Sequence, residues 1–190
     1  MLEYFKQDAA RWLMPGHVCA PNELTIAKLF TLLVTHAPLR AMLLWRIAGW
    51  LKQKRAPFLF GMLHRSILFF FGLEICDAAK IGGGLYVPHP VGTVIQVERM
   101  GRNVSVIASA TIGLRNTYAF PRIGDNVFVG AGARILGDIT IGNDAIIGAN
   151  AVVIEDVPAG GTVVGIPGRL IKIYGEAVDD RRQDSAHALQ

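Results

Sequence analysis

A six-residue period runs through the second half of this chain of 190 residues. Every sixth position is β-branched at Ile123, Val129, Ile135, Ile141, Ile147 and Val153. A second column, four positions after each of these, reads Val127, Ala133, Ile139, Ala145, Ala151 and Val157. Extended backward, the frame takes in Ile75, Ile81 and Val87 and, after a slip of one residue, Val94, Met100, Val106 and Ile112. A fixed short period of this kind indicates a solenoid of stacked repeats.

Each repeat of six residues predicts one short strand followed by a tight turn. The β-branched residue packs on the same position of the neighbouring coil, and glycine permits the turn. Since each coil covers the next, the core becomes a long stack. We therefore predict a mainly β protein with a parallel β-helix over residues 75–175. An α-helical region over 1–74 precedes it, and a disordered, polar tail over 176–190 follows it.

Apolar residues recur at helical spacing over 24–33 and 39–51, and a further helix is expected from residue 57 to about 71. Asn22 is a candidate N-cap for the first of these helices. This helical half carries nine Lys and Arg against four Asp and Glu, or +5, whereas residues 75–190 carry ten against eleven, or −1. The helices could pack on one another and on partner subunits, or they could lie on an anionic membrane with their basic side chains toward the lipid.

The composition excludes several classes of protein. Although 52% of the residues are hydrophobic and 18% charged, no run of about 20 apolar residues is long enough to form a spanning helix. The N-terminus lacks the basic and apolar regions of a secretory signal. The two cysteines lack C-x-x-C spacing, so they do not predict a metal site. The composition also argues against a nucleic-acid-binding tail. We expect a cytoplasmic protein, peripheral to the inner face of the membrane if its helices bind lipid.

Two motifs carry a family resemblance: Ile-Gly-Gly-Gly-Leu-Tyr-Val-Pro-His-Pro-Val-Gly-Thr-Val-Ile at 81–95 and Val-Gly-Ile-Pro-Gly-Arg at 164–169. With the repeats, they resemble the hexapeptide-repeat acyltransferases, most closely the serine acetyltransferase branch. The similarity covers roughly residues 70–172. It implies a left-handed parallel β-helix, homotrimers, and an acetyl-CoA-dependent O-acetyltransferase that requires no metal.

The resemblance assigns two catalytic residues. His89 falls where the family has its catalytic histidine. Imidazole suits this role because it titrates near neutral pH, and it can remove the proton from an acceptor hydroxyl that otherwise attacks a thioester poorly. Glu74 occupies the place of the family's aspartate that orients the histidine. A carboxylate bonded to one ring nitrogen fixes the tautomer and stabilises the imidazolium as it forms.

For the donor, the resemblance points to acetyl-CoA lying along the coils. Backbone groups near Gly113, Ala131 and Ala149 would face the pantetheine arm, which needs amide partners without side-chain bulk. The segment that contains Gly165 and Pro167 matches the family's C-terminal motif. The residues that could meet the nucleotide phosphates are Arg169 and Lys172.

Departures from the family concern the acceptor. The family's Arg-His-Pro segment reads Ala-Phe-Pro at 119–121 here, and its aspartate before the histidine is Pro88. These changes leave the charges of an amino acid without their usual partners. The segment 114–121 interrupts the repeats and must project, and its Tyr118 and Phe120 could stack on a sugar face. We therefore expect a sugar hydroxyl of a cell-surface polysaccharide precursor as acceptor. Serine O-acetyltransferase and a non-catalytic hexapeptide scaffold are the alternatives.

Overall fold

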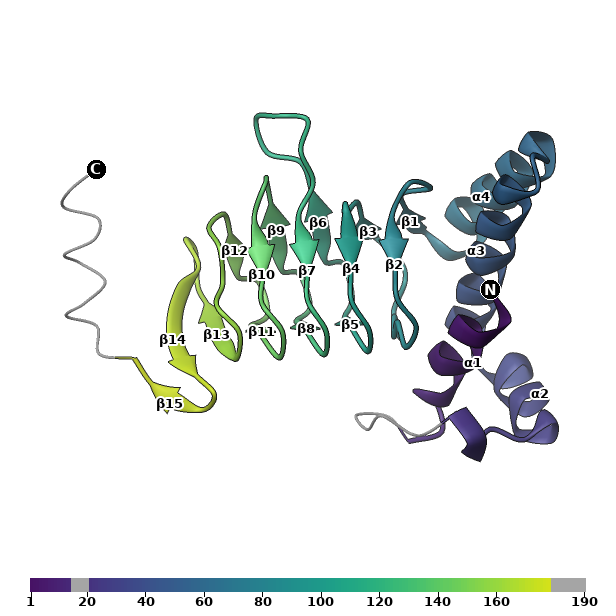
Figure 1. Ribbon diagram of the computed structural model, residues 1–190, viewed down its shortest axis with the longest axis horizontal. Helices are drawn as coiled ribbons and strands as arrows, with labels where there is room; N and C mark the ends of the chain where they lie inside the picture. The colour runs from purple at the N-terminus through teal and green to yellow at the C-terminus, as the bar shows by residue number, and fades with distance from the viewer. Residues whose placement is uncertain (15–20, 179–190) are drawn as a thin grey trace.

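The computed structural model describes residues 1–14 and 21–178, which form a parallel β-helix closed at one end by helices (Figure 1). One sheet contains β1 (Leu73–Ile75), β3 (Thr93–Ile95), β6 (Thr111–Gly113), β9 (Arg134–Leu136) and β12 (Val152–Val153). The second contains β2 (Lys80–Ile81), β4 (Arg99–Met100), β7 (Arg122–Ile123) and β10 (Thr140–Ile141). The third contains β5 (Ser105–Val106), β8 (Phe128–Val129), β11 (Ile146–Ile147), β13 (Gly161–Val164), β14 (Arg169–Ile173) and β15 (Glu176–Ala177). The first sheet takes one strand from each of five coils.

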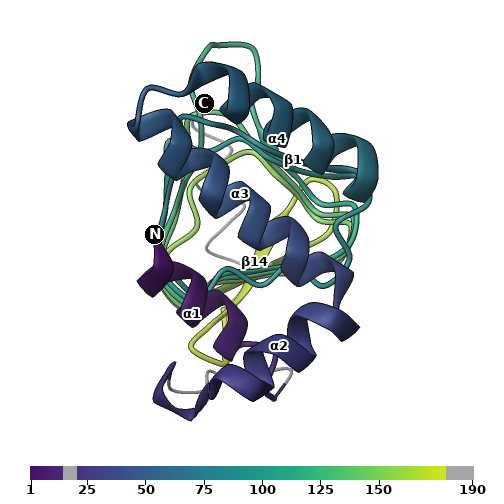
Figure 2. The ribbon, with the colours of Figure 1, turned by 90° about the vertical axis from the view of Figure 1, so that its right-hand side faces the viewer.

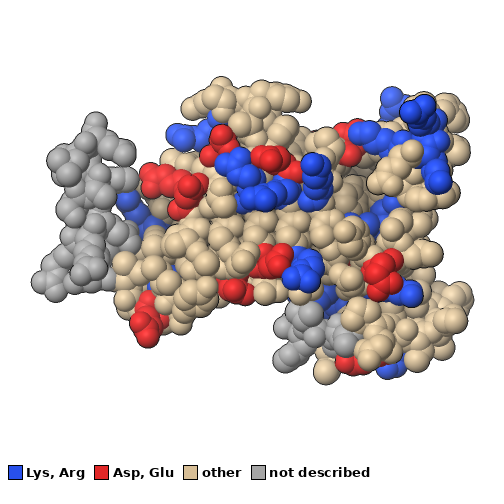
Figure 3. Space-filling model, viewed as in Figure 1, with Lys and Arg blue, Asp and Glu red and all other residues tan. Residues whose placement is uncertain are grey.

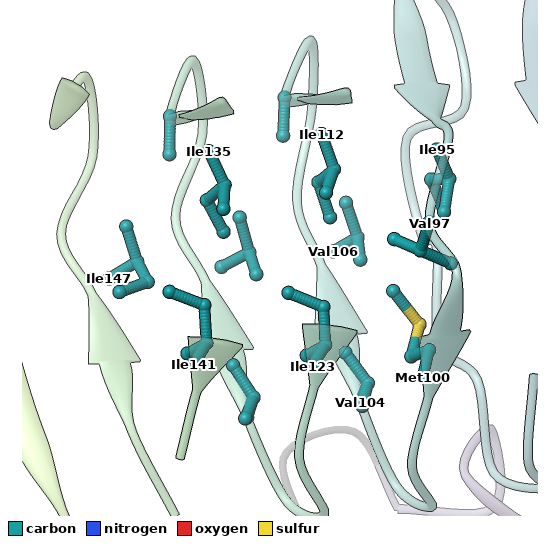
Figure 4. Close-up of a cluster of buried hydrophobic side chains, with 14 of the residues drawn as sticks. Ile95, Val97, Met100, Val104, Val106, Ile112, Ile123, Ile135, Ile141 and Ile147 are labelled. Carbon is teal, nitrogen blue, oxygen red and sulfur yellow. The ribbon is translucent and has the colours of Figure 1, made fainter. Parts of the chain in front are cut away.

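The core is the predicted stack of β-branched side chains (Figure 4). Strand register aligns Ile75, Ile95, Ile112, Ile135 and Val153 in one column, and none of the five is more than 3% exposed. The expected inward position at Val94 is wrong, because Ile95 points inward and Val94 is half-buried. The frame slips here because the turn that contains His89 has extra residues before β3.

The described residues form four α-helices: α1 (Leu2–Ala10), α2 (Ile26–Thr35), α3 (Ala37–Gln53) and α4 (Pro57–Phe71). The helices α3 and α4 lie across the end of the first coil, and α2 packs against α3 outside the outline of the coils (Figure 2). The helices α2, α3 and α4 match the expected helical stretches, whereas α1 has no predicted counterpart. Asn22 is not the N-cap of α2; it lies in a short 3-10 helix, η1 (Pro21–Glu23). Instead, Thr25 Oγ1 accepts a hydrogen bond of 3.2 Å from the Lys28 N–H, satisfying a free donor of the first turn.

A buried ion pair fastens α1 and α3 to the first coil. Arg46 Nε and Asp8 Oδ2 lie 2.8 Å apart, and neither side chain is more than 6% exposed. Arg46 also donates to the carbonyl of Ile81, and Asp8 accepts from the N–H of Leu85. Burial raises the pKa of Asp8, and the bonds from Arg46 oppose that shift. The pair is satisfied on both sides, as a buried charge requires.

The C-terminal end of the β-helix departs from parallel pairing. β14 turns back antiparallel to β13, and β15 pairs antiparallel with β14. The expected tail over 176–190 is therefore wrong for residues 176–178, which belong to this region of the fold. Residues 179–190 lie outside the described part of the chain.

Candidate active site

His89 lies on one longitudinal edge of the β-helix. We call the turns that lead from the six-stranded to the five-stranded sheet the histidine edge; they comprise residues 88–92, 107–110, 130–133 and 148–151. The hairpin turn 165–168, between β13 and β14 of the six-stranded sheet, continues this edge, because its backbone bonds to Val152 directly after the last of these turns. Backbone hydrogen bonds stack these turns: the Gly132 N–H donates to Ala108 at 2.8 Å, and the Asn150 N–H to Ala131 at 2.8 Å. Ala131, Ala149, Gly165 and Pro167, the residues expected to face the donor, therefore line the same edge as His89.

The turn of His89 is held by Thr93. The Thr93 hydroxyl donates to the carbonyl of His89 at 3.2 Å and accepts from the N–H of Ser109, one coil further on, at 3.1 Å. Thr93 is fully buried, and both of its hydrogen bonds are partly buried. The His89 ring is exposed. A polar residue at a buried strand position was the available sequence signal for Thr93, which the sequence prediction missed.

An open groove passes in front of the imidazole. The turns contribute Pro88, Val91 and Ser109, and Phe70 and Phe71 of α4 contribute aromatic side chains. The ring thus combines solvent access with an apolar wall on one side. This arrangement lets a small hydroxyl compound reach a base of the required chemistry.

Glu74 is held by Gln96 rather than by His89. The Gln96 Nε2 donates to Glu74 Oε1 at 2.9 Å, and no hydrogen bond joins Glu74 to His89 within residues 1–14 and 21–178. Gly113 is the next neighbour, since a Cβ built on it would lie 3.5 Å from Gln96 Oε1. The structure thus brings Glu74, Gln96 and Gly113 together, and Gln96 is a polar site residue that the sequence prediction missed.

Gly113 leads into a different edge from His89. We call the turns that connect the five-stranded to the four-stranded sheet the loop edge; they comprise residues 76–79, 96–98, 114–121, 137–139 and 154–156. The segment 114–121 projects from the stack between β6 and β7, as predicted (Figure 1). At its tip Tyr118 is 88% exposed, and its ring centroid lies 5.4 Å from that of Phe120.

The two cationic residues expected at the donor phosphates are both exposed on β14. Arg169 pairs with Val164 and stands beside the turn that contains Gly165 and Pro167. Lys172 pairs with Thr162, at the far end of β13 from that turn. Arg169 thus lies near the histidine edge, and the structure does not bring Lys172 to it.

Comparisons with known proteins agree with this geometry. The family model "Bacterial transferase hexapeptide (six repeats)" matches residues 120–155. The serine acetyltransferase of Staphylococcus xylosus is 38% identical over 150 residues, which cover 77% of this chain and 69% of that protein. That of Bacillus subtilis strain 168 is 36% identical over 162 residues, covering 83% and 73%.

Solved structures give the same result. A crystal structure of Neisseria gonorrhoeae serine acetyltransferase in complex with serine has a TM-score of 0.75 at 30% identity, covering 90% of this chain and 69% of that one. A serine acetyltransferase in complex with CoA has a TM-score of 0.74 at 30% identity, with the same coverage.

The stacked hexads and the histidine edge define a hexapeptide-repeat transferase with a left-handed parallel β-helix, as predicted. Within that class, the chain belongs to the serine acetyltransferase family. The expected enzyme class, an O-acetyltransferase, is confirmed. The expected sugar acceptor and a role in polysaccharide biosynthesis are wrong, because relatives 36–41% identical are serine acetyltransferases.

Proposed function

We propose that this protein transfers an acetyl group from acetyl-CoA to the hydroxyl of serine. The observation that carries the proposal is the similarity over nine-tenths of the chain to solved relatives in complex with serine and with CoA. The exposed imidazole of His89 beside an open groove supplies the required base.

In the proposed reaction, His89 removes the proton of the serine hydroxyl as the oxygen attacks the thioester carbonyl. A carbon–oxygen bond forms, the carbon–sulfur bond breaks, and the imidazolium returns the proton to the departing thiolate. Proton transfer of this kind accelerates a reaction by about 10² to 10⁴. The proposed role of Glu74 as a positioning residue rests on its negative charge, which would stabilise the imidazolium, because its carboxylate is bonded to Gln96 and not to His89.

The stacked turns of the histidine edge support the assignment of the donor site. Ala131 and Ala149 occupy the same place in successive coils and carry little side-chain bulk. An extended diamide arm could therefore approach the backbone along this edge, with Arg169 near its end to pair a phosphate. Lys172 has no role in this proposal, because it lies at the other end of β14.

The departures from the family bear on serine affinity. Pro88 lines the groove and Phe120 belongs to the projecting loop, and neither side chain can pair the carboxylate or ammonium of serine. Unpaired charges are costly to remove from water. We therefore expect a high KM for serine, with the rate of the bound complex determined by His89.

A homotrimer would bring the two edges together. In one chain, the first sheet separates the histidine edge from the loop edge that contains Tyr118 and Phe120. A three-fold assembly can set the loop edge of one subunit beside the histidine edge of the next. We propose that the acceptor site forms at that junction, with the loop supplied by the neighbouring subunit.

Thiol release from acetyl-CoA tests the function. We expect turnover with serine, saturating only at high concentration, and loss of turnover in His89→Ala. Circular dichroism should show that the variant is folded, because the ring is exposed. Turnover with simple or carrier-linked sugars and none with serine would overturn the proposed acceptor.

Subunit mixing tests the shared site. Chains carrying His89→Ala and chains carrying Phe120→Ala are each expected to be weakly active. After random reassembly, about a quarter of the sites would combine an intact histidine with an intact loop. Recovery of about that fraction of activity supports the shared site, and no recovery in mixed trimers would contradict it.

A further inference from the structure

The helical region is basic along an unusually long stretch. Residues 24–73 contain seven Lys and Arg and no Asp or Glu. Of these cations, Arg46 is buried against Asp8, and the other six are exposed. Space-filling atoms of Lys and Arg gather over the upper end of the α3 and α4 region (Figure 3). Lys52 forms an ion pair with Asp77, and the remaining excess of positive charge on this region attracts an anionic surface.

The outward side of α4 is apolar. Phe58 is 81% exposed, Met62 49% and Phe69 83%, and their spacing of four and seven residues places them on one stripe of the helix. A shallow groove continues this stripe past Arg65 and Phe70. We call this surface the α4 face; it consists of Pro57, Phe58, Gly61, Met62, Arg65, Ser66, Phe69 and Phe70.

Cations stand in and beside the α4 face. Arg65 lies within it, and Lys54 and Arg55 precede the first turn of the helix. The one side-chain hydroxyl of the face, that of Ser66, is already used, because it donates to the carbonyl of Met62 at 2.9 Å. The face therefore offers aromatic area and positive charge without a free directional hydroxyl that would specify a protein partner.

The length of the helices limits how the chain could meet a membrane. Among the described residues, no single helix is long and apolar enough to span a bilayer. Only α2 and α3 taken together reach that length and composition, and a bend of 109° separates them. The helix α4 has 15 residues. Apolar area with flanking cations on a helix of this length suits contact in the plane of the lipid headgroups.

We propose that the α4 face binds the surface of an anionic lipid bilayer, with Phe58 and Phe69 at the acyl boundary and Lys54, Arg55 and Arg65 at the headgroups. A second copy of the chain is a poorer occupant. A two-fold contact through this face would bring Arg65 near its own equivalent, with no acidic residue in 24–73 to compensate. Anionic headgroups supply that compensation.

Vesicle flotation of the full-length protein tests the proposal. One vesicle preparation contains phosphatidylcholine alone, and the other contains phosphatidylcholine mixed with phosphatidylglycerol. We expect flotation with the anionic vesicles at low salt, little with the neutral ones, and a decrease as salt is added. Absence of flotation with anionic vesicles at low salt, or equal flotation with both preparations, would overturn the proposal.

Two variants separate the apolar and the electrostatic contributions. Phe58→Ser with Phe69→Ser should lower partitioning at least about tenfold, through the loss of buried apolar area. Lys54→Glu with Arg65→Glu should lower it at least about 25-fold, since each basic residue near the surface contributes about fivefold. The controls are Tyr174→Ser, which alters an aromatic residue 67% exposed in the turn between β14 and β15, and Arg102→Glu on the β-helix.

The controls should float like the unaltered protein, and circular dichroism should show that all variants are folded. Light scattering without lipid identifies the competing occupant. If the chain self-associates through this face, the Phe58 and Phe69 variant will form smaller particles in solution while flotation remains unchanged. That result would assign the face to a contact between copies and overturn the lipid proposal.

Discussion

Gln96 donates a hydrogen bond of 2.9 Å to the carboxylate of Glu74, joining β1 to the residue that follows β3. The amide thereby fixes one carboxylate oxygen and leaves the other oxygen for a further partner. A short chain of contacts, from Glu74 through Gln96 to Gly113, connects the first three coils at the loop edge.

Glu74 can be tested as a positioning residue. Glu74→Gln removes the charge that would stabilise the imidazolium, so we expect kcat to fall at least about tenfold while the KM for acetyl-CoA is unchanged. Glu74→Asp should recover part of the rate. Steady-state kinetics with both variants measures this split. Equal loss in the two variants, or a change confined to KM, would contradict the positioning role.

Thr93 should affect both activity and stability. Thr93→Val keeps the volume but removes the hydroxyl that bonds the His89 carbonyl and the Ser109 N–H. Because Ser109 is exposed and its bond to Thr93 is only partly buried, the lost hydrogen bonds should cost about 0.5 to 1.5 kcal/mol. We expect that loss in urea denaturation and a lower kcat, with Thr93→Ser close to the unaltered protein. An unchanged free energy of unfolding in Thr93→Val would show that the turn containing His89 does not depend on this hydroxyl.

Two glycines should respond to alanine in opposite ways. At Gly130, a Cβ would lie 2.6 Å from the backbone nitrogen of Ala149, so Gly130→Ala must push two coils apart, at a cost of about 1 to 3 kcal/mol. At Gly49, inside α3, nothing lies within 4 Å of the added Cβ, and alanine should stabilise the helix by up to about 1 kcal/mol. Thermal denaturation should show a lower melting temperature for Gly130→Ala and a higher one for Gly49→Ala than for the unaltered protein.

The pair of Lys52 and Asp77 predicts a small dependence of stability on pH. The hydrogen bond from Lys52 lowers the pKa of Asp77 below its usual 3.8. The contribution of Asp77 is therefore present above pH 3.8 and is lost as pH falls through the lower pKa of the folded state. Both side chains are partly exposed, so Asp77→Asn should cost less than about 1 kcal/mol near neutral pH. Denaturation of both proteins at neutral and at acidic pH should show the difference shrinking; a difference that grows in acid would contradict the sign.

The repeat could be predicted from the sequence because one residue type recurs where one packing environment recurs. Ile123 and Ile135 occupy equivalent inward positions, so periodicity alone identified them as core. The prediction that Val94 points inward is wrong because the turn around His89 breaks the period. Val94 and Ile95 are adjacent β-branched residues, and only one of them can occupy the inward position. The register with Ile75 gives that position to Ile95, which is buried.

The site was less predictable than the fold. His89 could be found because its motif is contiguous, whereas Gln96 depends on the register of β1 against β3, which no local pattern encodes. The assignment of the acceptor went wrong for another reason. Pro88 and Phe120 give the side-chain chemistry at two positions, and two positions do not outweigh a similarity that covers 77% of the chain in sequence and 90% in structure.

The antiparallel return of β14 along β13 limits how this protein can vary in length. Any coil added after β13 would have to displace the hairpin, because the strand edge on which it would stack is already paired. Between β9 and β12 the chain advances one coil in 18 residues, and both neighbours there are parallel strands. Insertion of a further coil of that size is thus compatible with the middle of the stack and incompatible with its end. The hairpin of β13 and β14 therefore ends the solenoid by occupying the edge on which another coil would stack.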